Sequence, residues 1–331
     1  MRMEQSRTAE LRSVRLIAVG GTIAMSGDRA VPALDAAALL EGLPALASGH
    51  GLEAETALSL PGPHLSLDQA LEVARRAVAA ADSGEGVVIT SGTDTMEEVA
   101  VLCAMLYGGE APIVLTGANR PASSPGADGP ANLLDAVALA SSPVASGLGV
   151  VVAFGGEIHA AMSVRKVDST GPAAFGSPIA GPLGRIVERR VWLHARPVRP
   201  EALAVERLRH RVPIATVALG DDGEALGRLA DGCDGLVLVA FGAGHLSAAA
   251  LKHLRTAVRR VPVLVTCRPD RSSMLFDTYG FEGAESDVRA SGAVCVPFLS
   301  PQAARMALLC CLAAGLDRDG IAAALAPWDA Q

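Results

Sequence analysis

The sequence predicts an α/β protein with a larger N-terminal domain built on a parallel sheet and a smaller C-terminal α/β domain. Short runs of β-branched residues alternate with longer segments rich in alanine and leucine. In the first half of the chain these runs occupy residues 14–19, 87–90, 113–116 and 150–154. Buried parallel strands have this composition, and their alternation with helix-like segments is typical of βαβ units.

The segments between the strand-like runs are predicted to be helices, at residues 67–81, 96–107 and 131–140. Half of the 331 residues are hydrophobic, and only 3% are aromatic. Small apolar side chains of this kind suit helices that pack closely on a sheet. The chain is also too long for one small core and long enough for two domains.

The composition changes near residue 190, where we place the domain boundary. Residues 185–211 are rich in arginine and proline, with glutamates interspersed, and we interpret them as a solvated connector. We predict an N-terminal domain at residues 1–190, a linker at 191–212 and a C-terminal domain at 213–331. The alternation then resumes, with strand-like runs at 214–219, 235–240, 261–267 and 293–298, and helix-like segments at 246–259 and from residue 301.

Charge and composition argue against several classes of partner. The net charge is −7, from mixed signs rather than a block, so no basic surface for nucleic acid is expected. No apolar run approaches the roughly 18 residues that a membrane span needs. The first 15 residues carry charges of both signs and lack the apolar core of a secretory signal. We therefore expect a cytoplasmic protein without a membrane partner.

Cysteine and histidine spacing gives no indication of a metal site. None of the six cysteines forms a C-x-x-C pair, and most lie in apolar runs, as small core residues do in a reducing compartment. The seven histidines contain no H-E-x-x-H or similar spacing, so we predict no zinc site.

Candidate chemistry begins in the loops after the strands, because ligands of parallel α/β sheets collect at the carboxyl ends of the strands. The first run ends in Gly20-Gly21-Thr22. Two glycines allow a sharp turn and leave backbone N–H groups accessible. The spacing matches neither a dinucleotide-binding G-x-G-x-x-G nor a P-loop. On its own, Thr22 is better explained as a turn residue or a cap.

The second loop is Gly92-Thr93-Asp94, followed by a predicted helix start. Thr95 and Glu98 have the spacing of a capping box, which suggests structural roles for both. Thr93 and Asp94 precede that cap beside the positive end of the helix, where a carboxylate is electrostatically favoured. Asp94 is therefore either a second cap or a functional group.

The third loop contains Ala118 and is long for a plain connection, which hints at function. Asp128 and Pro130, further along this loop, stand where the N-cap and first turn of the next helix belong.

After the fourth strand lies Lys166, one of only two lysines among 28 basic residues. A buried lysine can lose its proton, whereas arginine effectively cannot, so a lysine in a chain that otherwise uses arginine is a candidate for chemistry. Lys252 stands on a predicted helix and is interpreted as a surface residue.

Taken together, these loops resemble the bacterial-type L-asparaginase family. The resemblance is carried by Gly20-Gly21-Thr22-Ile23-Ala24, by Gly92-Thr93-Asp94-Thr95-Met96-Glu97-Glu98, and by Thr116-Gly117-Ala118-Asn119-Arg120-Pro121 with the later Ala127-Asp128-Gly129-Pro130. Three such motifs in order, each at a strand end, are highly specific. Weaker similarity around Gly280-Phe281-Glu282-Gly283 and Ser300-Pro301-Gln302 extends the resemblance to nearly the whole chain.

The resemblance implies a flavodoxin-like N-terminal domain and hydrolysis of a side-chain amide to a carboxylate and ammonia, without a metal or organic cofactor. Thr22 would attack the amide carbon and form an acyl-enzyme. Thr93, Asp94 and Lys166 would form a proton relay. A threonine hydroxyl needs such a neighbouring base before it becomes a useful nucleophile. A homodimer or homotetramer is also implied.

Two departures from the family pattern leave the substrate open. The loop at residues 23–34 has no tyrosine, which many members carry there, and the segment expected to hold the substrate α-carboxylate contains Pro63 and His64 in place of the usual serine and polar partner. By resemblance, Pro63, His64, Gly92 and Ala118 would line the substrate site. L-asparagine is the expected substrate, a different amide is the alternative, and a non-catalytic binding protein on the same fold is a third possibility.

Overall fold

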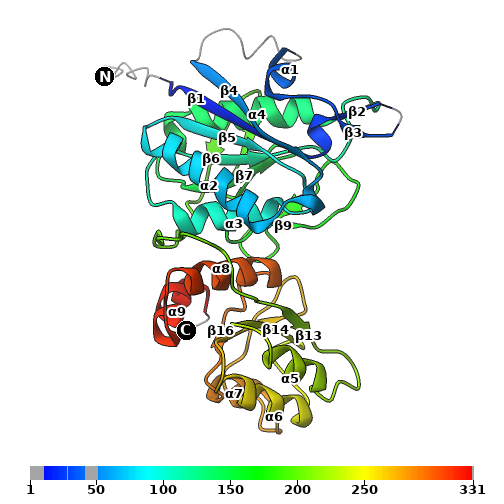
Figure 1. Cartoon of the computed structure of the whole chain (residues 1–331), viewed down its shortest axis with the longest axis vertical. Coiled ribbons are helices and arrows are strands. Elements are labelled where there is room, and N and C mark those ends of the chain that lie inside the picture. The colour runs from blue at the N-terminus through cyan, green and yellow to red at the C-terminus, as the bar shows by residue number, and fades with distance from the viewer. Residues whose placement is uncertain (1–10, 28, 42–50, 330–331) are drawn as a thin grey trace, which may run out of the picture.

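The computed structural model describes residues 11–27, 29–41 and 51–329. It has two parts, stacked along the long axis of the molecule (Figure 1). The N-terminal part holds an eight-stranded sheet, and the C-terminal part holds a four-stranded sheet. The predicted α/β fold, with a larger N-terminal and a smaller C-terminal domain, is confirmed.

Five neighbouring strands of the large sheet are parallel, and three at one edge are antiparallel. In spatial order the strands are β4 (Leu52–Leu60), β1 (Val14–Gly20), β5 (Gly86–Thr90), β6 (Ile113–Thr116), β7 (Val150–Phe154), β8 (Glu157–Ala160), β11 (Gly184–Val187) and β12 (Arg190–Leu193). The parallel part therefore follows the flavodoxin-like order second–first–third–fourth–fifth.

Helices cover both faces of this sheet, which explains why its central strands are continuously apolar. In β5, Val87 and Ile89 contribute to one core cluster, with α2 (Leu67–Asp82) and α3 (Met96–Leu106). Val88 between them points into the other cluster, with α4 (Gly129–Ser141) and the short α1 (Ala36–Glu41). Every residue of β5, β6 and β7 is buried as a result.

The strands at both edges of the sheet were not predicted from sequence, because edge strands lack a continuous apolar run. Strand β4 is mostly half-buried or exposed and alternates polar with apolar residues. At the opposite edge, β11 and β12 form an antiparallel hairpin whose exposed residues include Trp192. The interpretation of residues 185–211 as a solvated connector is wrong at its start, because β12 extends to Leu193.

Beyond β12 the chain continues without a helix or strand from residue 194 to 213. Arg196 donates to the carbonyl of Ser146 at 2.6 Å, and Arg199 donates to the carbonyl of Gly109 at 2.7 Å. Both arginines thereby attach the segment to the N-terminal domain. The domain boundaries at residues 190 and 213 stay a prediction.

The C-terminal sheet is parallel, in the order β13 (Ile214–Thr216), β14 (Leu236–Ala240), β15 (Val263–Cys267) and β16 (Val294–Cys295). The first and last of these strands are shorter than the runs that predicted them. The helices of this part are α5 (Glu224–Ala230), α6 (Ala248–Ala257), α7 (Glu285–Ala290), α8 (Pro301–Ala313) and α9 (Arg318–Leu325).

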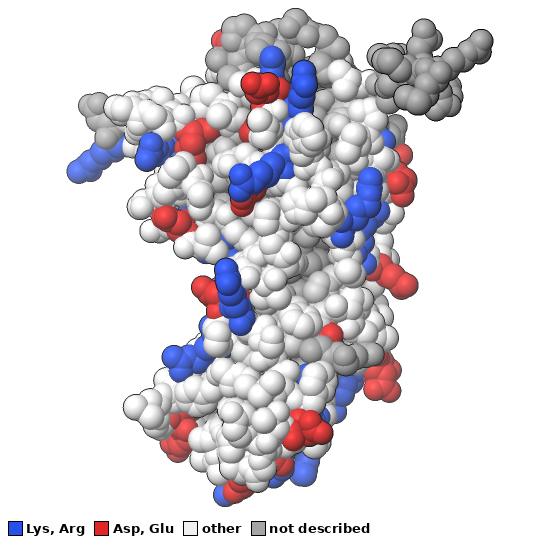
Figure 2. Space-filling model, turned by 180° about the vertical axis from the view of Figure 1, so that it is seen from behind, with Lys and Arg blue, Asp and Glu red and all other residues white. Residues whose placement is uncertain are grey.

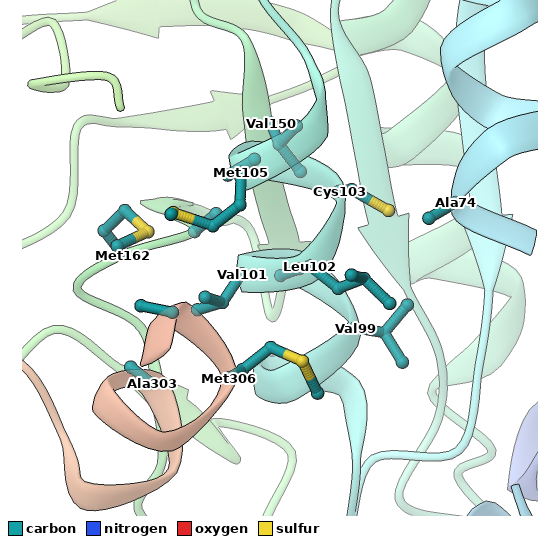
Figure 3. Packing of buried hydrophobic residues seen from close by; sticks show 14 of the residues in the cluster. Ala74, Val99, Val101, Leu102, Cys103, Met105, Val150, Met162, Ala303 and Met306 are labelled. Atoms are coloured by element: carbon teal, nitrogen blue, oxygen red, sulfur yellow. The ribbon is translucent and has the colours of Figure 1, made fainter. Parts of the chain in front are cut away.

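Helix α8 packs against α3 and so joins the two domains. Ala303 and Met306 of α8 belong to the same buried cluster as Val99 and Val101 of α3 (Figure 3). Beside this cluster, Arg305 of α8 donates to the carbonyl of Val212 at 2.9 Å. The helix that starts immediately after the Thr93–Asp94 loop is therefore held from both sides, by the sheet and by the C-terminal domain.

Five of the six cysteines are buried, as predicted for small core residues, and Cys233 is partly buried. Burial raises the pKa of the Cys103 thiol to about 12, so this thiol stays protonated and unreactive. Within the described part of the chain, no group of three or more His, Cys, Asp or Glu side chains is arranged to hold a metal ion.

The charged side chains are mixed over the surface. Figure 2 shows Lys and Arg interspersed with Asp and Glu on the face drawn. None of the helices formed by the described residues has the length and apolarity to cross a membrane.

Candidate active site

The loops after β1 and β5 meet at the point where the strand order of the parallel sheet reverses. These two strands are neighbours, paired from Val14↔Gly86 to Ala18↔Thr90. The loop after β1 leads onward to β4 on one side of the sheet, whereas the loop after β5 leads to β6 on the other. In open α/β sheets such a reversal leaves a crevice in which ligands bind.

Glycines allow three loops to approach backbone to backbone here. A Cβ atom placed on Gly21 would lie 2.4 Å from the Cα of Gly92, and one placed on Gly92 would lie 2.7 Å from the Cα of Gly62. Gly21 also has a φ of 80°, a conformation that favours glycine. The loop of Thr22, the loop of Thr93 and the turn that contains Pro63 are thus held together.

We expect Gly92→Ala to damage both the site and the fold. The new methyl group would overlap the backbone of Gly62, which cannot yield as a flexible side chain would, and overpacking of this kind costs about 1–3 kcal/mol. The unfolding temperature and the turnover rate of Gly92→Ala should therefore both be lower than those of the wild type. Gly280→Ala is the matched control, because nothing lies within 4 Å of a Cβ at that position. Equal unfolding temperatures for the two variants would contradict the close approach.

Lys166 contacts two of the other predicted catalytic residues. Its Nζ donates to Thr93 Oγ1 at 2.8 Å and to Asp94 Oδ1 at 2.7 Å. The lysine is on β9 (Arg165–Lys166), a two-residue strand in the long excursion after β8, and it pairs with Phe175 of β10 (Phe175–Gly176). The predicted relay residues therefore form one hydrogen-bonded group.

This group spans the boundary between protein interior and solvent. Thr93 is only 6% exposed, whereas the Asp94 side chain is 60% exposed and the Lys166 side chain 19%. The ammonium group therefore reaches from a water-accessible carboxylate to a buried hydroxyl. Such an arrangement allows a proton to pass between the buried hydroxyl and the crevice.

Thr22 lies at the start of a 3-10 turn, Thr22–Ala24, at the tip of β1. Within the described residues, its hydroxyl makes no hydrogen bond to Thr93, Asp94 or Lys166. The turn continues into a small hairpin of β2 (Met25–Ser26) and β3 (Val31–Pro32). Thr22 therefore adjoins the predicted relay residues through the Gly21–Gly92 backbone contact, and not through a side-chain bond.

The backbone N–H groups that line the crevice differ in whether they are free to donate a hydrogen bond to a ligand. The N–H of Gly21 is already bonded to the carbonyl of Leu60 at 3.0 Å. In contrast, the N–H groups of the buried residues Gly92 and Thr93 have no acceptor among the described residues. Buried N–H groups without an acceptor are rare in proteins, so these two are the candidate donors to a substrate oxygen.

The predicted capping box at Thr95 and Glu98 is wrong in its bonds, although α3 does start where it was placed. Thr95 is the N-cap residue but makes no capping hydrogen bond with its side chain. Glu98 instead faces Arg305 of α8, at 3.4 Å. Tertiary contact with the C-terminal domain has taken the carboxylate away from the local bond that its spacing predicts.

Asp128 occupies the predicted N-cap position of α4, but its carboxylate also does not cap the helix. It accepts the backbone N–H groups of Asn119 and Arg120 at 2.9–3.1 Å. These bonds shape the loop after β6, in which Ala118 is fully buried with its methyl group in the core. Asn119 in turn donates to the carbonyl of Gly171 at 2.8 Å, which links this loop to the excursion that carries Lys166.

Pro63 and His64 lie in a 3-10 turn, Gly62–His64, and both are exposed. The next polar residue, Ser66, caps α2: its hydroxyl accepts the N–H of Gln69 in a complete capping box. Ser66 is therefore committed to the helix start. Of the side chains in this segment, His64 is the one left to face a ligand.

One ionisable group that contacts β9, the strand that carries Lys166, was not predicted from sequence. Glu97 Oε2 accepts the backbone N–H of Lys166 at 3.2 Å. Burial raises the pKa of the Glu97 carboxyl to about 7, although the bond to Lys166 and the charge of Arg165 oppose the rise. The sequence shows only two consecutive glutamates in a first helical turn, so no local pattern distinguishes Glu97 from Glu98.

The chain resembles proteins of known family over nearly its full length. The model of the asparaginase N-terminal domain matches residues 13–199, and that of the glutaminase/asparaginase C-terminal domain matches residues 211–325. A probable L-asparaginase of Deinococcus radiodurans is 34% identical over 95% of this chain and 97% of its own.

Two further relatives point the same way. A probable periplasmic L-asparaginase of Haemophilus influenzae is 33% identical over 92% of this chain and 89% of its own. The crystal structure of a probable cytoplasmic L-asparaginase from Campylobacter jejuni superposes with a TM-score of 0.84 at 29% identity, covering 95% of this chain and 99% of that one. Because both domain models match in order, and the predicted relay residues meet at the carboxyl end of β5, the chain belongs to the asparaginase family.

Proposed function

We propose that this protein is an amidohydrolase that converts L-asparagine to L-aspartate and ammonia. The single observation that supports this most strongly is the bonding of Lys166 Nζ to both Thr93 and Asp94, beside the loop of Thr22. The family, and the names of its relatives as L-asparaginases, point to the same reaction class.

In the proposed mechanism, Thr22 Oγ1 attacks the carbon of the substrate's side-chain amide and releases its proton to the relay. The N–H groups of Gly92 and Thr93 stabilise the oxyanion. The C–N bond then breaks as the relay returns a proton to the nitrogen, which leaves as ammonia. Water attacks the acyl ester on Thr22 and frees the carboxylate product and the threonine hydroxyl. The chain's own residues carry each of these steps.

The substrate is proposed to lie against Pro63, His64, Gly92 and Ala118. Ala118 is fully buried, so its contribution is a backbone one, and Pro63 has no N–H to donate. Because Ser66 is engaged in the helix cap, His64 is the proposed partner of the substrate's carboxylate. The presence of Pro63 and His64, where the family usually has a serine and a polar partner, is the specific observation in favour of a second candidate. That candidate is an amidohydrolase of the same mechanism with a different amide substrate.

A substrate panel tests the proposal and separates the two candidates. Ammonia release should be measured from L-asparagine, L-glutamine, D-asparagine and simple aliphatic amides under identical conditions. L-asparagine should have the highest kcat/KM. A higher value for another amide would replace asparagine as substrate but keep the mechanism. Tight binding of these amides without turnover would instead indicate a non-catalytic binding protein.

We also propose a cytoplasmic location, a homodimer or homotetramer, and the domain boundaries near residues 190 and 213. The location rests on the similarity to a relative named as cytoplasmic, although another relative is named as periplasmic. Size-exclusion chromatography with light scattering measures the assembly, and a monomer at micromolar concentration would contradict it.

A further inference from the structure

The strand that carries Lys166 has only two residues and needs support from outside its own hairpin. One flank is held by the C-terminal domain, where Asp270 Oδ1 forms an ion pair with Arg165 Nη1 at 2.8 Å. The lysine's own backbone is held by Glu97, from the first turn of α3. The backbone of Lys166 and its ammonium group are thus both attached to the same element, because Thr93 and Asp94 directly precede that helix.

Lys166 is therefore attached at two points to one segment of the chain, and Glu97 provides the second of these points. Lys166 Nζ donates to Thr93 and Asp94 in the loop before α3, and Lys166 N donates to the Glu97 carboxylate in the first turn of that helix. A lysine side chain is a flexible four-carbon stem, so the side chain alone does not fix the position of the ammonium group. That position also depends on where the backbone of the lysine is held. Loss of the backbone attachment would free the strand to move relative to Thr93.

We propose that Glu97 is a positioning residue for Lys166, whose carboxylate holds the backbone of the lysine so that the ammonium group stays on Thr93 and Asp94. This inference rests on the proposed amide hydrolysis by the Thr22 site. It assigns Glu97 no contact with substrate: the carboxylate acts through Lys166.

The protonation of Glu97 should make this positioning depend on pH. The charged groups that face it are Arg165 and Lys166 from β9 and Glu98 from its own helix. Beyond these, Asp270 partly neutralises Arg165 and Arg305 partly neutralises Glu98. An ionised carboxylate accepts an N–H bond more strongly than a neutral acid does. Because the pKa of Glu97 is about 7, the attachment should tighten, and activity rise, as pH increases through that value.

The kinetic test compares Glu97→Gln with the wild type across pH 5.5–8.5, a range chosen to span about 1.5 units on each side of that pKa. The amide is close in shape but cannot ionise. We expect kcat to fall about tenfold to hundredfold, as misplacement of a catalytic group does, with KM changed by less than about twofold. The rise of kcat through pH 7 should disappear in Glu97→Gln and return in part in Glu97→Asp.

Glu98→Gln is the matched control, because Glu98 is the neighbouring glutamate and faces Arg305 rather than Lys166. Burial also raises the pKa of its carboxyl, so a general effect of removing a partly buried acid would appear in both variants. Glu98→Gln should lower the unfolding temperature slightly and keep the rise of kcat with pH. The midpoint of that rise should move to slightly lower pH, because the charge of Glu98 raises the pKa of Glu97.

A second measurement does not depend on activity. The chain has two lysines, so labelling with ¹⁵N-lysine in a Lys252→Arg background leaves one backbone amide signal, that of Lys166. This signal should shift with pH with a midpoint near 7, and the shift should vanish when Glu97→Gln is added. The spectrum separates this inference from the proposed function. If the signal titrates but the protein hydrolyses no amide, the contact between Glu97 and Lys166 stands and the proposed hydrolysis is wrong.

Two results would overturn the role of Glu97. One is a Lys166 amide signal that does not shift between pH 5.5 and 8.5 in the Lys252→Arg protein, which retains Glu97. This range spans about 1.5 units on either side of the Glu97 pKa. The other is a folded Glu97→Gln variant with wild-type kcat and an unchanged pH profile. If Glu97→Gln fails to fold, the titration in the Glu97-containing protein decides the matter alone.

Discussion

Replacement of Thr22 by alanine should lower kcat for ammonia release about 10³-fold or more, because the variant lacks the oxygen that forms the acyl bond. Thr22 stands at the tip of β1 on a turn formed by Gly20 and Gly21, beside the Thr93 loop. The substrate should still bind, since the groups proposed to contact it are elsewhere. Initial rates over a range of asparagine concentrations measure both effects.

Thr22→Ser is the control for this change. Serine keeps the hydroxyl oxygen and loses only the methyl group of a partly buried side chain. It should therefore retain measurable turnover and an acyl-enzyme step. Thr22→Ala with more than one tenth of the wild-type kcat, in protein of normal unfolding temperature, would contradict the nucleophile assignment.

Replacement of Lys166 by methionine should lower kcat about 10²- to 10⁴-fold, the range that general acid–base catalysis contributes. Methionine keeps much of the length and apolar stem of lysine but removes the ammonium that bonds to Thr93 and Asp94. The relay is thereby interrupted, although the backbone bond from Lys166 N to Glu97 can persist. The unfolding temperature should change little.

Lys252→Met is the matched control, because Lys252 is the only other lysine and is exposed on α6. It should keep the wild-type kcat. If both lysine variants retain wild-type rates, the relay has no part in turnover. If both lose activity equally, the effect of the Lys166 change is not specific to the site.

The parallel core of the fold was predictable from sequence because burial on both faces leaves a plain signal. The runs at 87–90, 113–116 and 150–154 became β5, β6 and β7 almost residue for residue. The edge strands left no comparable signal. In β4 and β12, polar and apolar residues alternate, as they also do in loops. The pairing partner of β4 is also distant in sequence, because Leu52 pairs with Val14 of β1.

The site was predictable where it depends on residues that follow strands, and not where it depends on tertiary contacts. The rarity of lysine singled out Lys166, and the structure brings it into contact with Thr93 and Asp94. The role of Glu97 could not be found, because its acceptor bond joins residues separated by 69 positions. Likewise, the capping spacing of Glu98 concealed its contact with the C-terminal domain.

The central claim is that Thr22 carries the acyl group during hydrolysis, and it can be tested directly. Wild-type protein is mixed with excess L-asparagine, quenched in acid within milliseconds, digested and analysed by mass spectrometry. We expect the peptide containing Thr22 to gain the mass of one aspartyl group, and the Thr22→Ala peptide to gain none. Ammonia release with the acyl group on another residue, or with no acylated peptide at any quench time, would contradict it.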